Sequence, residues 1–356
     1  MKSWPDRRIL DLFGIELPII LAPMAGPGTA ALAIAVSEAG GLGSLPCAQL
    51  NAAEIRTAIE TIRRSTSRPI NINFFCHTPP TFDRERDRAW RARLKPYYLE
   101  LGLDPETPLA PPSRKPFDAE ACALVEEFRP EVVSFHFGLP AQNLLDRVKA
   151  TKARVIGSAT SVREARWLES RGCDAIIAMG FEAGGHRGNF LSDDMARQIG
   201  TFALVPQIAD TVKLPVIAAG GVADARGIVA ALALGAAAVQ IGTAYLFCPE
   251  ARVPALHLEA LTNAADDDTM ITNVFTGRPA RGIANRLMLE VGPIAANLPN
   301  FSLASSAIGP LRAKSEPAGS SDFMNLWSGQ SVRLARRGIP AAEMTRVLAS
   351  EALARL

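Results

Sequence analysis

Leu214-Pro-Val-Ile-Ala-Ala-Gly-Gly221 is the stretch that says most about the fold, and Val239-Gln-Ile-Gly-Thr243 repeats its pattern one strand later. Each is an apolar run of strand length followed by glycine, and a helical pattern begins after the first, near Asp224. Glycine lets the backbone approach a ligand closely, and the N–H groups and dipole of a helix N-terminus bind phosphate. Glycine after one strand is usually only a turn, but glycines after two consecutive strands indicate a phosphate site. The expected phosphate ligands are Gly220, Gly221, Gly242 and Thr243.

Outward from these stretches, short apolar runs alternate with helical patterns as far as about residue 245. The runs are apolar on both faces, as expected for parallel strands that helices cover. The expected strands are Ile19–Ala22, Gly41–Leu45, Ile70–Phe74, Val132–Phe137, Arg154–Ser158, Ala175–Ala178, Val216–Ala219 and Ala237–Ile241. The helical patterns include Thr29–Ala39, Ala52–Arg64, Ser161–Arg171 and Ala225–Leu234. Eight such strands predict an α/β fold, a closed (β/α)8 or TIM barrel, in which the loops after the last two strands commonly bind phosphate.

Two regions interrupt this alternation. Residues 78–116 are rich in proline and charge, follow the third strand, and are too long for an ordinary βα loop, so we expect an insertion or lid. After about residue 250 the expected elements are a helix at Arg252–Asn263, an irregular stretch at Thr272–Gly319 that includes a loop at Ala304–Ser321, and a helical region near Asn325–Leu356. The predicted organisation is a barrel over residues 1–250 and a mainly helical segment over residues 251–356 that covers the C-terminal mouth of the barrel.

The composition is that of an ordinary globular protein. The chain has 356 residues, 48% of them hydrophobic, and a formal net charge of +2, which gives no indication of a nucleic-acid or membrane-surface partner. The N-terminus is charged, and no apolar run reaches the length of a membrane span. Five cysteines are scattered without a Cys-x-x-Cys pair, which argues against a disulfide framework or a zinc site. We expect a cytoplasmic protein with no metal, and a homo-oligomer is allowed.

The ends of the first and third strands predict the site of a planar ring. Side chains at the C-terminal ends of barrel strands face the mouth. Ala22-Pro23-Met24 forms a rigid, apolar and polarisable turn there, although Met24 could also only fill the core. Asn71 and Asn73 share one face of the third strand, which suits recognition of a heteroaromatic ring by amide groups, unless one of them only satisfies backbone groups.

Histidines provide the candidate catalytic and substrate-binding groups. His186 follows the sixth strand in Met179–Gly188, where Gly184, Gly185 and two further glycines leave the imidazole free to approach a ligand. We expect it to act as a general base or to hydrogen-bond to the substrate, the alternative being a structural role. His136 ends the fourth strand and faces the pocket if the polar face of that strand is the interior of the barrel. His77 and His257 are interpreted as structural, and Arg187 is expected to pair with Glu182 or another loop carboxylate.

Together these motifs resemble the nitronate monooxygenases, formerly called 2-nitropropane dioxygenases. The resemblance covers most of the chain, and Glu182-Ala-Gly-Gly-His186 is its specific part because other FMN barrels share the phosphate loops. Its other motifs are Ala22-Pro-Met-Ala-Gly26, Ser134-Phe-His-Phe-Gly138 and Phe275-Thr-Gly-Arg-Pro-Ala-Arg-Gly-Ile-Ala-Asn-Arg286, the last of which looks like the class I branch.

The resemblance implies FMN at the barrel mouth, no metal, and oxidation of alkyl nitronates or nitroalkanes with O2 to carbonyl compounds and nitrite. His186 then occupies the position of the catalytic base. Members of the family typically have tyrosines in the C-terminal pocket region, whereas this chain has Phe301 and no tyrosine after Asn297. Tyr97 and Tyr98, in the insertion, are therefore expected to face the substrate in place of the missing tyrosines. His136 is the third residue expected to face the substrate.

Other functions stay open at the level of the sequence. An FMN-dependent NAD(P)H oxidoreductase, reducing a quinone or an enoyl thioester, resembles this family and would consume reduced nicotinamide without any nitronate. A flavin-binding protein without turnover is a different class of function, and the base-like position of His186 argues against it. A barrel that binds a sugar phosphate at the same loops would carry no yellow chromophore.

Overall fold

The computed structural model describes residues 3–110 and 114–356, and its centre is one parallel sheet closed into a barrel. The strands are β1 (Ile19–Leu21), β2 (Gly43–Pro46), β3 (Ile70–Phe75), β4 (Val132–His136), β5 (Arg154–Ala159), β6 (Ala175–Met179), β8 (Val216–Ala219) and β9 (Ala238–Ile241). Their order is β1-β9-β8-β6-β5-β4-β3-β2, and a parallel bridge between Ile20 and Leu42 joins the two ends of that order. The predicted (β/α)8 barrel is confirmed, with strand bounds within two residues of those expected.

Helices cover the outside of this barrel. They are α2 (Ala30–Glu38), α3 (Ala52–Ser65), α5 (Ala119–Phe128), α6 (Gln142–Ala150), α7 (Val162–Ser170), α8 (Thr201–Ala209) and α9 (Ala225–Ala233). Side-chain caps fix where several of them begin. Asn51 and Glu54 form a capping box at the start of α3, and Asp224 accepts hydrogen bonds from the first backbone N–H groups of α9. The apolar sides of the helices and the strands form one continuous core.

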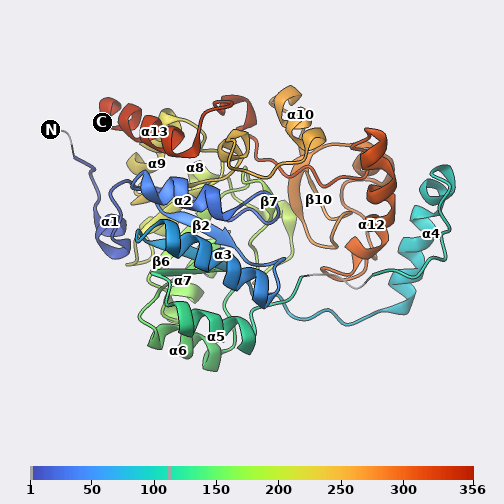
Figure 1. Cartoon of the computed structure of the whole chain (residues 1–356), viewed down its shortest axis with the longest axis horizontal. Helices are drawn as coiled ribbons and strands as arrows, with labels where there is room; N and C mark the ends of the chain where they lie inside the picture. The colour runs from blue at the N-terminus through green and yellow to red at the C-terminus, as the bar shows by residue number, and fades with distance from the viewer. Residues whose placement is uncertain (1–2, 111–113) are drawn as a thin grey trace.

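The C-terminal helix α13 (Ala341–Arg355) completes this outer layer. It packs against α2 and α9, and its Thr345 lies 2.8 Å from the Tyr245 hydroxyl, just after β9 (Figure 1). The expectation that all of residues 251–356 cover the mouth is therefore wrong for α13. The reason is topological: β9 is followed by the short 3₁₀ helix Thr243–Phe247 and not by an α-helix, and α13 supplies the missing cover between α2 and α9.

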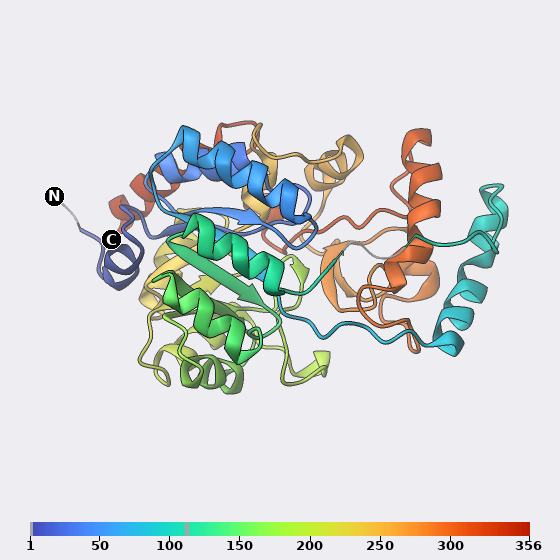
Figure 2. The ribbon, with the colours of Figure 1, turned by 60° about the horizontal axis from the view of Figure 1, so that its bottom comes forward.

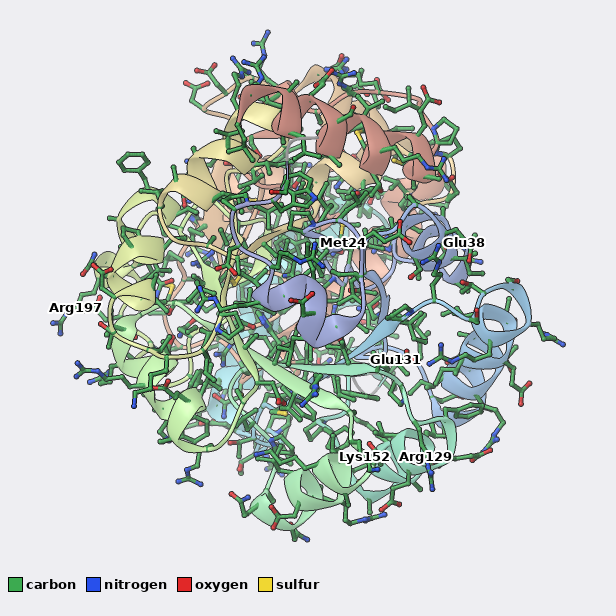
Figure 3. The ribbon with its side chains drawn as sticks, turned by 90° about the vertical axis from the view of Figure 1, so that its left-hand side faces the viewer. Met24, Glu38, Arg129, Glu131, Lys152 and Arg197 are labelled. Carbon is green, nitrogen blue, oxygen red and sulfur yellow. The ribbon has the colours of Figure 1, made fainter. Side chains whose placement is uncertain are left out.

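A short helix closes the end of the barrel at which the strands begin. α1 (Arg8–Phe13) buries Ile9, Leu10 and Phe13 in the barrel core. Seen from this end, α1 lies across the middle of the view, Met24 is labelled near the centre, and Arg129 and Lys152 lie at the periphery (Figure 3). The ends of the strands that can hold a ligand therefore face the other way.

At that other end lies a second assembly of elements. β10 (Thr269–Thr272), β11 (Ala280–Ile283) and β7 (Gly185–His186) form a three-stranded antiparallel sheet. The remaining helices α10 (Ala255–Asn263), α11 (Arg286–Val291) and α12 (Ala304–Ser315) belong to the same C-terminal segment. Two long connections carry the chain from the barrel to α4 (Arg84–Glu100) and back (Figure 2).

No helix in residues 3–110 or 114–356 is long and apolar enough to cross a membrane.

The insertion after β3 packs on the C-terminal segment. α4 lies beside α12 (Figure 1), where the indole Nε1 of Trp90 donates to the carbonyl of Ala304 at 3.2 Å and the Tyr98 hydroxyl donates to the carbonyl of Ala307 at 2.7 Å. Tyr97 packs edge-on against Phe323. Tyr97 and Tyr98 are thus buried in this contact, and their predicted place against the substrate is wrong.

The loop expected at Ala304–Ser321 is instead helical over Ala304–Ser315. Its serines, Gly309 and Pro310 suggest a loop, but Ala304, Ala307, Ile308 and Leu311 recur at helical spacing and are all buried. Packing of this face against α4 outweighs the weak helix propensity of the intervening residues. The stretch expected to be irregular also contains β11 and α11, whereas the expected helical region near Asn325–Leu356 is an α-helix only from Ala341.

Truncation of Leu311 tests this packing. Leu311 is fully buried, so Leu311→Ala removes methyl groups from a filled interface, and we expect the free energy of unfolding to fall by about 2–5 kcal/mol. Leu289→Ala, on the exposed side of α11, is the control and should change it by less than about 0.5 kcal/mol. Urea unfolding followed by circular dichroism measures both, and equal losses would contradict the assignment.

Candidate functional site

One cavity of about 550 Å³ opens at the C-terminal ends of the barrel strands. Its wall includes the turn after β1, the ends of the other strands and part of the C-terminal segment. The cavity brings together these residues singled out from the sequence: Ala22, Pro23, Met24, Asn73, His136, Gly184, Gly185, His186, Gly220, Gly221, Gly242 and Thr243. Residues far apart in the chain therefore line one ligand-sized space.

Asn71 is the one strand residue predicted for the site that does not line the cavity. It is fully buried, and its Nδ2 donates to the Ser44 hydroxyl at 2.9 Å. Two residues along a strand is about 6–7 Å, so Asn71 shares the face of Asn73 but lies deeper in the barrel. The assignment of Asn71 to a bound ring is wrong. Asn73 lies at the level of the cavity, where its amide donates to the carbonyl and hydroxyl oxygens of Ser134.

The glycine loops after β8 and β9 form one wall of the cavity. Gly220 and Gly221 adopt φ values of 102° and 73°, which a side chain would strain, and α9 begins four residues later. A Cβ on Gly220 would come within 2.9 Å of the Ala183 backbone nitrogen. This tight backbone turn exposes peptide groups instead of side chains to the cavity.

One part of this wall is not indicated by any sequence motif. Ser328 and Gly329, from the segment between α12 and α13, line the cavity beside Thr243, whose hydroxyl accepts a hydrogen bond from the Gly329 N–H at 2.9 Å. Trp327 lines it as well. A Ser-Gly pair in a loop is indistinguishable from an ordinary turn by composition, so only the fold shows that these residues reach the phosphate-type loops.

His186 is held by a backbone ladder and a hydroxyl group. Its strand β7 pairs with β11, with His186 opposite Ala280 and Gly185 opposite Arg281. Its ring Nε2 lies 3.0 Å from the Thr276 hydroxyl, which also lies 3.3 Å from the Arg278 carbonyl. If the Thr276 hydroxyl donates to that carbonyl, it accepts from Nε2–H, and Nδ1 is then the basic nitrogen. Within the described residues Nδ1 has no hydrogen-bond partner, so it is free for a ligand.

The surroundings of His186 keep its imidazole neutral. Its ring packs against Phe301 and Trp327, with centroids 5.2 and 5.4 Å away. Burial is the largest influence and lowers the pKa of His186 well below its ordinary value of 6.5. The charges and partial charges of Arg114, His136, Arg278 and His77 lower it further. A neutral imidazole can accept a proton, so this ring is able to act as a base.

His136 lies beside His186 but has both ring nitrogens occupied. Its Nε2 lies 3.2 Å from the His186 carbonyl, and its Nδ1 lies 2.6 Å from the Ser158 hydroxyl. Since a carbonyl can only accept, Nε2 donates and Nδ1 accepts from Ser158. Burial lowers the pKa of His136 to about 3, so it is neutral as well. The ring therefore positions the His186 backbone, and contact with a substrate stays a prediction.

Arg187 has a structural role different from the one expected. It is fully buried and donates to the carbonyls of Met179 and Gly180, at 3.1 and 2.8 Å, and to the Gln198 amide oxygen. Glu182 instead accepts from the backbone and hydroxyl of Thr201. The expected Arg187–Glu182 pair is thus replaced by a guanidinium that holds the end of β6 through backbone carbonyls.

No cluster of three or more potential metal ligands occurs in the described part of the chain.

Comparison with known proteins agrees with this arrangement. Residues 6–351 match the model of the nitronate monooxygenase family. This chain belongs to that family. It is 42% identical to the nitronate monooxygenase of Pseudomonas aeruginosa, over 97% of this chain and 98% of that one. It is 41% identical to the enzyme of the same name from Paraburkholderia phytofirmans, over 97% and 94%.

Solved structures related to this family member have the same fold. The nitroalkane oxidase of Streptomyces ansochromogenes is similar with a TM-score of 0.87 and 35% identity, over 97% of both chains. FabK from Thermotoga maritima is similar with a TM-score of 0.72 and 28% identity, over 98% of this chain and 96% of that one. The shared fold therefore covers nearly the whole chain, that is, the barrel together with the insertion and the C-terminal segment.

The protonation of His186 can be measured directly. Because its pKa lies well below 6.5, we expect the imidazole to stay neutral as the pH is lowered through 6.5. Histidine-selective ¹³C NMR follows the ring, and the spectrum of His186→Gln assigns its signal. A titration midpoint at or above 6.5 would show that burial and the nearby arginines do not set its charge.

Proposed function

We propose that this chain binds FMN at the mouth of its barrel and oxidises alkyl nitronates, and nitroalkanes after loss of a proton, with O2 to carbonyl compounds and nitrite. The observation that carries the proposal is the neutral His186, which lines the same cavity as the glycine loops after β8 and β9 and whose Nδ1 has no hydrogen-bond partner among the described residues. Membership in the nitronate monooxygenase family supports it.

The residues of the cavity fit a flavin. The loops at Gly220–Gly221 and Gly242–Thr243, beside the N-terminus of α9, suit one phosphate group, and FMN carries one where FAD carries two. The Gln240 amide oxygen is buried without a hydrogen-bond partner among the described residues, and Gln240 lines the cavity. An unsatisfied buried amide is costly, and the N–H-bearing edge of a flavin ring would satisfy it. Ala22, Pro23 and Met24 would then flank the ring.

The protein groups supply orientation and a proton acceptor. Bound flavin supplies the electron acceptor that is then reoxidised by O2. A nitronate reaches the cavity already deprotonated, so it needs only placement against the flavin. A neutral nitroalkane must first lose its α-proton, and His186 Nδ1 would take it while Thr276 holds Nε2. Phe75, Phe301 and Trp327 surround the His186 ring with apolar surface.

Localisation and assembly remain predictions. All five cysteines are free thiols, four of them buried, which supports a cytoplasmic location where thiols stay reduced. A homo-oligomer is compatible with the sequence.

Anaerobic mixing of the purified yellow protein tests the proposed function. Propionate 3-nitronate should bleach the flavin absorbance, and the chromophore released by heating should be FMN. NADH and NADPH, added separately, should leave the absorbance unchanged. Bleaching by a reduced nicotinamide and not by the nitronate would overturn the proposal in favour of a reductase on the same barrel.

Replacement of His186 separates the two substrate classes. His186→Asn removes the proton acceptor but keeps a polar side chain, so we expect kcat/KM for nitroethane to fall by about 10²–10⁴-fold. Activity with ethyl nitronate, which carries no proton to be removed, should be largely preserved and serves as the internal control. Equal losses on both substrates, measured at matched flavin content, would contradict the base assignment.

A further inference from the structure

Arg114 is a charged residue in the cavity wall for which neither the fold nor the proposed base chemistry accounts. It lies in the connection that returns from α4 to α5, and it lines the cavity. Its Nε is shielded from solvent and makes no hydrogen bond within residues 3–110 and 114–356. In the same described ranges it has no ion-pair partner, in contrast to the many surface arginines that pair with carboxylates.

Other polar groups with unsatisfied atoms surround the same aromatic rings. The Arg114 guanidinium lies 6.0 Å from the centre of the Phe301 ring, and His77 packs edge-on against that ring at 4.9 Å. Both ring nitrogens of His77, the Ser302 hydroxyl and the Nε of Arg278 are buried without hydrogen bonds to described residues. We call Arg114, Arg278, His77 and Ser302 the cationic corner.

The charge of Arg114 has no compensating carboxylate among the described residues, whereas the carboxylates of Asp193 and Glu164 act on Arg278. Arg278 stacks over Phe137 at 4.0 Å and donates one hydrogen bond to the Asn189 carbonyl, which is neutral. Burial lowers the pKa of Arg114 to about 10 and that of His77 to about 4. At neutral pH both arginines are therefore charged and His77 is not. A partly buried guanidinium without a carboxylate, as at Arg114, is costly for folding.

The contact with the Phe301 ring does not compensate the charge of Arg114. A distance of 6.0 Å from the ring centre is at the outer limit of a cation–π contact, so Phe301 compensates little of the lost hydration. A guanidinium is planar with donors in a fixed fork, which matches a planar group with two anionic oxygens. Carboxylates and nitronates both have this shape. Phe301 packs against both Arg114 and His186, so an anion at Arg114 would lie close to the base.

We propose that Arg114 is a specificity-determining residue that binds a planar anionic group of the substrate, either the nitronate itself or a carboxylate elsewhere on the same molecule. The proposal rests on the proposed function, because it assigns the substrate anion of that same site. Arg278 adds positive charge near the anion, and the neutral His77 adds unsatisfied hydrogen-bonding groups. The cavity thereby favours anionic substrates over neutral ones of the same size.

Substitution of Arg114 tests the proposal with two nitronates. Arg114→Gln removes the charge at nearly constant size, and we expect kcat/KM to fall about 10- to 100-fold, as for a lost charge-assisted hydrogen bond. If Arg114 binds the nitronate group, ethyl nitronate and propionate 3-nitronate lose activity equally. If it binds a carboxylate, the loss is confined to propionate 3-nitronate. Arg114→Lys should recover part of it.

Lys115→Gln is the matched control, because it removes the same charge from the neighbouring exposed residue and should change neither rate. Binding of nitrate and of propionate to the holoenzyme, measured by isothermal titration calorimetry, gives a readout independent of turnover and should weaken only in the Arg114 variants. If wild-type protein oxidises no nitronate, the proposed function fails, while Arg114-dependent anion binding would still support the site. Unchanged kinetics and unchanged anion binding in Arg114→Gln, at normal flavin content, would overturn the proposal.

Discussion

The two-residue ladder between β7 and β11 is the contact on which the site depends. It places Gly185 and His186 opposite Arg281 and Ala280 and so attaches the loop after β6 to the C-terminal segment. Without this pairing, a glycine-rich loop would have no fixed conformation, because glycine restricts the backbone least. The flexible sequence that allows His186 to approach a ligand is thus made rigid by residues almost a hundred positions further along the chain.

The same arrangement explains the charge state of the site. The C-terminal segment brings Phe301 and Trp327 over His186, and the insertion that packs on α12 returns through Arg114. Burial and nearby positive charge both keep the imidazole neutral. A positive cavity with a neutral base suits a substrate that arrives as an anion or becomes one when it loses a proton. The segments outside the barrel therefore determine the chemistry of its mouth, while the barrel supplies the phosphate-type loops.

Local patterns predict the barrel well, because each strand is a short run that is apolar on both faces and each loop glycine lies next to its strand. The positions of Gly220, Gly242 and His186 in the cavity follow from the rule that strand ends face the mouth. Asn71 shows the limit of this rule: alternation gives the face of a strand residue but not its depth in the barrel. Tyr97 and Tyr98 show another, since nothing in the sequence tells which surface an insertion packs on.

The site as a whole depends on long-range contacts that no sequence window contains. Ser328 and Gly329 reach Thr243 only because α13 returns to the barrel after them. No sequence motif around Arg114 indicates that it lines the cavity.

The central claim, that His186 takes the α-proton of a neutral nitroalkane, is tested most directly by the deuterium isotope effect on kcat/KM with 1,1-dideuterated nitroethane. The account predicts a primary effect in the wild type, well above unity. An effect of unity, with nitroethane turned over at an undiminished rate by His186→Asn, would contradict it.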